Sequence, residues 1–386
     1  MAHASFHNED AFDEDFTIYS VNETDVEPED TSGEDKIIEP FNPAFIRVDT
    51  RPMTIDLLLS RIEHKELDLQ PSFQRKGGIW NEKTQSRLIE SILIRIPLPA
   101  FYIDATNDDK WLVVDGLQRL TALKHFMIDK TLKLNDTEFL IDLVGKTHDE
   151  LPRQMQRRIM ETVVTVYLIE KGTPSEVKFN IFKRINTGGL PLSAQEIRHA
   201  LNQGKATEIL ERLASCKEFQ KAVDKSIRDD RMADRECVLR FFAFTIIPYK
   251  NYKSKEFDSF LNDCMGIMNK MTDEQLNGME KRFKRAMVAA CEIFGKDAFR
   301  KRYKVGAPRY PINKALFEAW SVNLRSLSDI QINSLKTRKE QLIEKFINLM
   351  QDRVFDASVS QGTGDIKKVN YRFDSIRRII TEVLSC

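Results

Sequence analysis

The stretch from Trp111 to Leu123 most constrains the fold of this chain. It reads Trp-Leu-Val-Val-Asp-Gly-Leu-Gln-Arg-Leu-Thr-Ala-Leu, so a short apolar run stops at an Asp-Gly pair and a helical pattern begins at once. A strand that turns directly into a helix directs several backbone N–H groups at one point, where the helix dipole adds positive potential. The pattern therefore predicts a strand–turn–helix unit whose turn suits a nucleotide or nucleic-acid phosphate.

The side chains of this turn support the same chemistry. Gly116 allows close backbone approach, Arg119 offers a two-pronged guanidinium, and Asp115 is a candidate ligand for a metal ion or a water. The alternative is a purely structural turn, because Asp-Gly pairs are common in turns and an arginine in a first helical turn is often only solvated.

The net charge of zero hides an uneven distribution. Residues 1–36 contain twelve acidic residues and one basic residue, which leaves 58 basic and 47 acidic residues in the rest of the chain. A basic body favours DNA as a partner, whereas an acidic, weakly apolar tail is typical of disorder. The tail is either a solvating extension or a segment that folds over the basic surface and competes with nucleic acid.

Composition excludes several classes of protein. No stretch approaches the roughly 20 apolar residues of a membrane span, and the N-terminus lacks the pattern of a secretory signal. The five cysteines are widely spaced, which predicts reduced thiols and neither a zinc site nor a disulfide framework. We therefore expect a cytoplasmic protein with no membrane partner.

Hydrophobic periodicity divides the chain into three parts. We expect a disordered acidic tail over 1–40, an α+β domain over 41–205 and an all-helical domain over 206–386. Thr54, Asn81 and Ser193 are expected to cap helices, and Glu196 completes a capping box with Ser193. Strands are expected near 67–69, 101–104, 110–114, 139–143 and 163–169, and a polar loop over 358–370.

Three clusters combine Gln, Arg or Asn with glycines beside a helix end, a combination that suits phosphate binding and the positioning of a water or base. Glu90 lies between the first two clusters and is a candidate metal ligand or general base, or else an exposed helical glutamate. The clusters are Gln74, Arg75 and Trp80; Asp115, Gly116, Gln118 and Arg119; and residues 182–198 with Arg184, Asn186 and Arg198.

The C-terminal half mixes basic and aromatic residues over 281–285, 299–304 and 309–310. This mixture suits phosphate contact with base stacking, or else it is a solvated helix face with buried rings. All six histidines precede residue 200, which argues against a histidine–metal nuclease in this half.

The chain resembles the GmrSD restriction-endonuclease N-terminal domain family. The resemblance rests on Pro71–Arg75 with Trp80, on Leu88–Leu93 followed by Ile96–Pro99, and on Val113–Arg119. The third cluster is similar to the family's Arg-x-Asn-x-x-Gly segment and its Leu-Ser-x-x-Glu-Ile-Arg continuation. Leu117 stands where the family commonly has a glutamine, and the HNH nuclease module that often follows is not found.

The resemblance implies a ParB/sulfiredoxin-like α+β core, followed here by an all-helical domain. It also implies a role in defence against foreign DNA, with nucleoside-triphosphate hydrolysis and sensing of modified DNA. By position, the nucleotide-site candidates are Gln74, Arg75, Asp115, Gln118 and Arg119, and the secondary candidates are Arg184, Asn186 and Arg198.

Three functional hypotheses follow. In the first, the chain is an NTP-hydrolysing, DNA-acting defence protein: Arg119 and the amides around Gly116 bind phosphates, Asp115 or Glu90 holds Mg²⁺, and Gln118 orients water. In the second, it is a non-catalytic, nucleotide-gated DNA sensor or adaptor that works with a separate nuclease. In the third, the domain nicks DNA through a metal ion held by Asp115 and Glu90.

Overall fold

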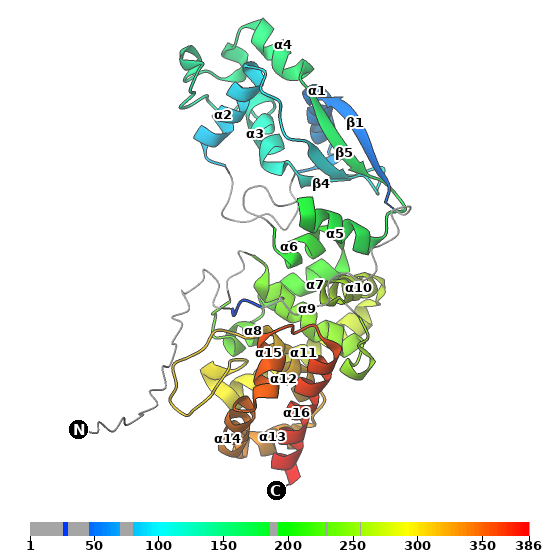
Figure 1. Cartoon of the computed structure of the whole chain (residues 1–386), viewed down its shortest axis with the longest axis vertical. Coiled ribbons are helices and arrows are strands. Elements are labelled where there is room, and N and C mark those ends of the chain that lie inside the picture. Colours follow the sequence, from blue (N-terminus) through cyan, green and yellow to red (C-terminus); the bar gives the residue numbers. More distant parts are fainter. Residues whose placement is uncertain are drawn as a thin grey trace, which may run out of the picture.

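The computed structural model describes residues 26–29, 46–69, 80–185, 192–227, 231–254 and 256–385. Gln74, Arg75 and Asn186, three of the predicted site residues, lie outside these ranges. The described chain is elongated, with an α+β domain at one end and a helical region at the other (Figure 1).

A five-stranded mixed sheet organises the α+β domain. Its strand order is β1-β5-β3-β4-β2, with antiparallel β1/β5 and β3/β4 pairs and parallel β5/β3 and β4/β2 pairs. The central strand β3 alternates as a half-buried strand should, since Phe101 and Ile103 are buried while Tyr102 is only half-buried. The strands are β1 (Val48–Thr54), β2 (Leu67–Asp68), β3 (Phe101–Asp104), β4 (Trp111–Asp115) and β5 (Val163–Ile169).

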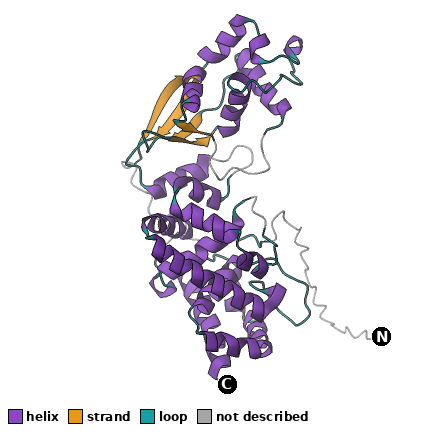
Figure 2. Cartoon of the chain, turned by 180° about the vertical axis from the view of Figure 1, so that it is seen from behind, coloured by secondary structure: helices purple, strands orange, loops and turns teal. Residues whose placement is uncertain are grey.

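Helices cover one face of this sheet, and the sheet lies along the side of the domain (Figure 2). The predicted caps are confirmed: Thr54 accepts a hydrogen bond from the Leu57 N–H at 3.3 Å, and Asn81 accepts one from the Thr84 N–H at 2.9 Å. The helices of this domain are α1 (Ile55–Glu63), α2 (Glu82–Leu93), α3 (Leu117–Met127) and α4 (Arg153–Glu161).

Two further helices, α5 (Ser175–Ile185) and α6 (Ala194–Leu201), lie between the sheet and the helical region (Figure 1). Ile169 at the end of β5 belongs to the same small apolar cluster as Phe182 of α5 and Ile197 of α6. The predicted capping box is present, because Ser193 accepts from the Glu196 N–H while the Glu196 carboxylate accepts from the Ser193 N–H.

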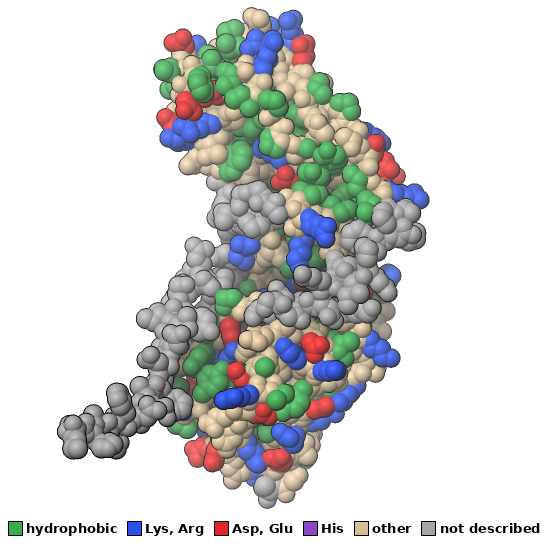
Figure 3. Space-filling view, viewed as in Figure 1, with side chains coloured by type: hydrophobic (Ala, Val, Ile, Leu, Met, Phe, Trp, Pro, Cys, Tyr) green, Lys and Arg blue, Asp and Glu red, His purple; other side chains and the backbone are tan. Residues whose placement is uncertain are grey.

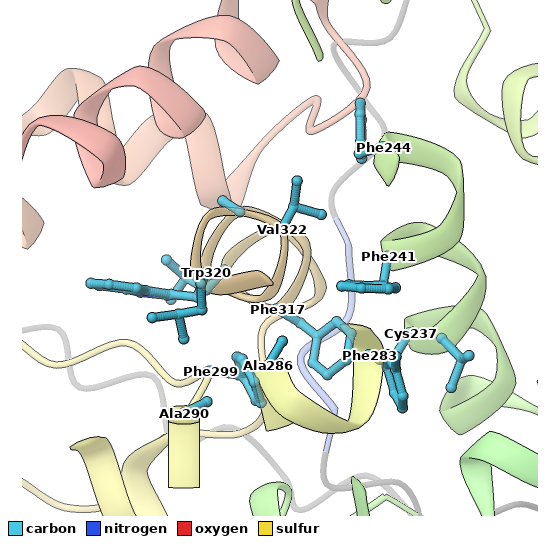
Figure 4. Packing of buried hydrophobic residues seen from close by; sticks show 14 of the residues in the cluster. Cys237, Phe241, Phe244, Phe283, Ala286, Ala290, Phe299, Phe317, Trp320 and Val322 are labelled. Carbon is cyan, nitrogen blue, oxygen red and sulfur yellow. The ribbon is translucent and has the colours of Figure 1, made fainter. Parts of the chain in front are cut away.

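The rest of the chain is helical, which confirms the α+β domain followed by an all-helical region. Its core is rich in aromatic rings: Phe241, Phe283 and Phe317 lie close together in Figure 4, and the Phe241 and Phe283 ring centroids are 5.1 Å apart. The helices are α7 (Lys205–Ala214), α8 (Lys217–Ala222), α9 (Ala233–Ile246), α10 (Phe257–Lys270), α11 (Asp273–Phe294), α12 (Lys314–Arg325), α13 (Asp329–Thr337), α14 (Lys339–Met350), α15 (Arg353–Ser360) and α16 (Ile366–Ser385).

Two element predictions were wrong. The strand expected over 139–143 is a loop that ends in a 3₁₀ turn, Ile141–Leu143. Two of its apolar side chains face outward, since Phe139 is 69% and Ile141 is 70% exposed, whereas Leu143 is buried. Hydrophobic side chains are indeed exposed on the face of the α+β domain that Figure 3 shows. The loop expected over 358–370 is mostly helix, because α15 ends only at Ser360 and α16 begins at Ile366.

No described helix is long and apolar enough to cross a membrane. The four cysteines within the described ranges are free thiols, and two of them, Cys237 and Cys264, are buried. Burial raises the pKa of the Cys237 thiol to about 12, so this side chain acts as a small core hydrophobe.

Acid sensitivity is expected at the junction between the domains. Burial, with a smaller contribution from the Arg235 charge, lowers the pKa of His199 from 6.5 to about 4. Between these values the unfolded chain binds a proton that the folded chain does not, so stability falls as the pH drops from 6.5 toward 4. Between pH 7.5 and pH 4.5 we expect the unfolding free energy of His199→Gln to fall by on the order of 2–3 kcal/mol less than that of the wild type. Urea unfolding at both pH values measures the difference.

The exposed His64 supplies the control, and His64→Gln should keep the wild-type pH profile. An unchanged profile in His199→Gln would show that His199 does not contribute to acid sensitivity.

Candidate functional site

The turn between β4 and α3 forms as the sequence predicts. Gly116 has φ +97° and lies directly between Asp115, the last residue of β4, and Leu117, the first residue of α3. A Cβ atom on Gly116 would lie 2.3 Å from the Phe101 ring. Both the left-handed backbone and the close approach to β3 therefore require glycine at this position.

Arg119 braces this turn from inside. Its Nη2 donates to the Asp115 Oδ2 at 2.8 Å and to the Ala100 carbonyl at 3.1 Å, and its Nη1 donates to the Pro99 carbonyl. The guanidinium also lies over the Phe101 ring, 4.4 Å from the centroid. One side chain thus ties the start of β3 to the end of β4 and the first turn of α3.

This arrangement changes the role expected for Arg119. The residue is only 8% exposed, and burial lowers the pKa of its guanidinium although Asp115 raises it. A phosphate that used the Arg119 fork would have to replace the protein groups it now binds. The first-turn N–H groups of α3 have no intrahelical acceptors, so they are the better phosphate donors in this turn.

A chain of polar contacts joins the first two sequence clusters. Gln118 accepts from the Trp80 N–H at 3.1 Å, and Gln85 of α2 donates to the Trp80 carbonyl at 2.6 Å. The Gln85 side-chain oxygen lies 3.1 Å from the His125 Nδ1 of α3. Trp80 is therefore attached to both α2 and the first turn of α3.

Two tyrosines beside this turn were not predicted as site residues. Tyr102 of β3 pairs in register with Asp115, and its ring stacks on Tyr167 of β5 with centroids 4.8 Å apart. Both side chains are half-buried, and burial, then Tyr167, then Asp115 raise the pKa of Tyr102. The signal was present in β3, since Tyr102 lies on the opposite face from the apolar Phe101 and Ile103.

Glu90 is an anchoring residue. It is 3% exposed, and its carboxylate accepts from the backbone N–H groups of Glu138, Phe139 and Leu140 at 2.7–2.9 Å. Burial alone would raise its pKa, but these three hydrogen bonds lower it. A general base needs a pKa near the working pH and a free oxygen, so this geometry argues against the catalytic role considered for Glu90.

The described carboxylates do not fit a magnesium site made by Asp115 and Glu90. The Asp115 carboxylate binds the Arg119 guanidinium, and both Glu90 oxygens accept backbone N–H groups. Across the described ranges, no group of three or more His, Cys, Asp and Glu side chains is placed to hold a metal ion. The metal prediction for these two residues receives no support from the geometry.

The two described arginines of the third cluster lie in different environments. Arg184 is exposed on α5, so its side chain is open to a ligand. Arg198 of α6 is 1% exposed and binds Asp258 of α10 at 2.7 Å and Glu236 of α9 at 3.7 Å. Its charge therefore attaches α6 to the helical region, which argues against the nucleotide contact considered for it.

In the basic–aromatic segments of the helical region the phenylalanine rings are buried, as the structural alternative predicts, but two of the basic side chains are buried as well and are not solvated. The Phe283 and Phe299 rings are 0% and 2% exposed and belong to the core, so they are not available for base stacking. Arg300 and Lys301 are also buried and hydrogen-bonded to protein groups.

The described domain thus combines a mixed sheet with a strand–glycine–helix turn that is hydrogen-bonded to Trp80. Residues 55–202 match the family model described as GmrSD restriction endonuclease, N-terminal domain. The match confirms the resemblance seen in the motifs and covers the α+β domain from α1 onward together with α5 and α6, so that β1 lies outside it. No curated protein matches the chain.

Replacement of Gly116 should lower the unfolding free energy for two reasons that can be measured separately. Gly116→Ala places a side chain at φ +97° and against the Phe101 ring, so we expect a loss of roughly 3 kcal/mol or more in unfolding free energy. Gly145 also has positive φ but no atom within 4 Å of an added Cβ, so Gly145→Ala should lose only about 1 kcal/mol. Equal losses of unfolding free energy in the two variants would show that the contact with Phe101 does not add to the cost of Gly116→Ala.

Glu90 offers a test of anchoring against catalysis. We expect Glu90→Gln to reduce stability by about 2 kcal/mol, because a neutral amide satisfies the three N–H groups poorly. Hydrogen exchange at residues 138–140 should accelerate, whereas the exposed Glu82→Gln on the same helix should change neither measurement. Unchanged stability and exchange in Glu90→Gln would contradict the anchoring role.

Proposed function

We propose that the β4–α3 turn binds the phosphates of a nucleotide and that the chain is a nucleotide-controlled component of a restriction-type defence system. The observation that carries the proposal is the Trp80–Gln118 hydrogen bond, which attaches Trp80 of the first sequence cluster to the turn. The N–H groups of the first turn of α3 would bind the phosphates. The stacked Tyr102 and Tyr167 offer an aromatic surface beside the turn for the base.

Nucleotide binding receives more support from the geometry than hydrolysis does. The Glu90 carboxylate is occupied by backbone N–H groups and the Asp115 carboxylate by Arg119, so neither is a free general base. We therefore favour a nucleotide-gated DNA sensor or adaptor that works with a separate nuclease. An NTP-hydrolysing form, in which Gln118 orients water, is the second candidate, and metal-dependent nicking by Asp115 and Glu90 is disfavoured.

DNA is the proposed target of the system. The family description is that of a restriction endonuclease domain, and the chain beyond residue 36 has an excess of basic residues. Salt-sensitive binding of DNA by the full chain is the expected behaviour.

The decisive measurement is titration calorimetry with ATP, GTP, CTP and UTP, with and without DNA, together with phosphate release. Gln118→Ala removes the acceptor of the Trp80 N–H, and Tyr102→Ala removes the stacked ring, so each should weaken nucleotide binding about tenfold. Arg119→Ala is unsuitable as the main test because it also removes the brace of the turn.

Asp108→Asn, in the exposed β3–β4 hairpin turn, is the matched control and should bind as wild type does. Binding without phosphate release would support the sensor, and release that depends on Gln118 would support hydrolysis. No binding of any of the four nucleotides would overturn the proposal.

A further inference from the structure

Four residues of the acidic N-terminal region, Val26–Glu29, lie against the helical region, whose contacting side chains are at least 211 positions away in sequence. Val26 is 6% exposed and belongs to the helical core. It forms a parallel bridge with Ile312, whose carbonyl accepts from the Glu27 N–H at 2.8 Å. The segment is the short blue trace among the helices in Figure 1.

The Glu27 carboxylate binds two buried side chains. Lys301 Nζ lies 2.6 Å from its Oε1, and Asn313 Nδ2 donates to its Oε2 at 2.9 Å. Lys301 is 8% exposed and otherwise contacts the Ser360 hydroxyl at 2.7 Å. Glu27 thus supplies the negative charge next to a buried ammonium group.

The Glu29 carboxylate binds a second set of partners. Arg240 of α9 lies 2.5 Å away, Thr363 donates at 2.8 Å, and Lys314 of α12 lies at 3.7 Å. Burial raises the pKa of Glu29, but Arg240 and Lys314 outweigh it, so the net pKa is lowered. This carboxylate therefore stays ionised between the two cations.

The helical region is suited to receive these two carboxylates. Residues two apart project to the same side of an extended chain, so Glu27 and Glu29 can meet Lys301 and Arg240 together. Without the segment the buried Lys301 would lose the counter-charge of Glu27, whereas Arg240 would keep that of Glu236. Val26 packs into the adjacent apolar core, so Arg240, Lys301 and Ile312 define the groove in which the segment binds.

We propose that this groove is a peptide-binding site for an extended acidic segment of the pattern apolar-Glu-x-Glu, and that Val26–Glu29 is its intramolecular ligand, exchangeable for the same sequence supplied in trans. The combination of apolar packing at Val26 with two spaced cations favours a peptide over nucleic acid.

Occupancy of the groove is connected to the family-matched domain by ion pairs. Arg240, which binds Glu29, also binds Glu236 at 2.8 Å. Glu236 lies 3.7 Å from Arg198 of α6, inside the matched residues. Release of the segment would therefore change the charge environment that attaches α6 to the helical region, which gives the groove a regulatory role.

The test uses the full chain with Glu27→Gln and Glu29→Gln, which weakens the intramolecular ligand. A fluorescent peptide of residues 22–33 should bind this variant about tenfold or more tightly than wild type, whose groove is filled by the tethered segment. The same peptide with glutamine at both positions should not bind, and added salt should weaken binding.

The matched control is Glu340→Gln with Glu344→Gln, which removes two exposed carboxylates from α14 and should behave as wild type. If the double variant does not fold, as judged by circular dichroism, the single variant Glu27→Gln replaces it. Equal peptide binding by folded variant and wild type, or no binding by either, would overturn the proposal. Displacement of the peptide by duplex DNA would reassign the groove to nucleic acid.

Discussion

The helical region depends on buried charges that neutralise one another. Glu318 of α12 and Arg372 of α16 form an ion pair with both side chains fully buried, and Arg240 of α9 lies 3.5 Å from the same glutamate. An uncompensated buried charge costs several kcal/mol, so these helices favour an arrangement in which Glu318, Arg372 and Arg240 pair. Apolar packing supplies the driving force, and the ion pairs restrict which packing is allowed.

The same set of charges extends toward both ends of the molecule. Glu236 pairs with both Arg240 and Arg198 of α6, and Glu29 of the N-terminal segment pairs with Arg240. Helix α6 also packs through Ile197 against the end of β5, so it contacts the sheet on one side and the charge network on the other. The family-matched domain and the unmatched helical region are thus joined by polar as well as apolar contacts.

Much of the fold was predictable because local chemistry fixes it. The helix caps at Thr54, Asn81 and Ser193, four of the five strands and the turn at Gly116 all follow from residues close in sequence. Strand β1 was missed because it is a mostly polar, mostly exposed strand at the edge of the sheet. The loop around Phe139 was mistaken for a strand because apolar residues alone do not tell which side faces the core. The candidate site was found through its turn, but the aromatic pair of Tyr102 and Tyr167 depends on pairing between β3 and β5.

The sequence by itself determined the strand–glycine–helix turn, the family resemblance, and the division into an α+β domain and a helical one. These features rest on backbone geometry and hydrophobic periodicity, which neighbouring residues control. Only the tertiary structure decided which charged residues are buried. It made Arg119 a brace, Glu90 a loop anchor and Glu29 a partner of Arg240, because a charged side chain acquires its role from groups that are distant in sequence and adjacent in space.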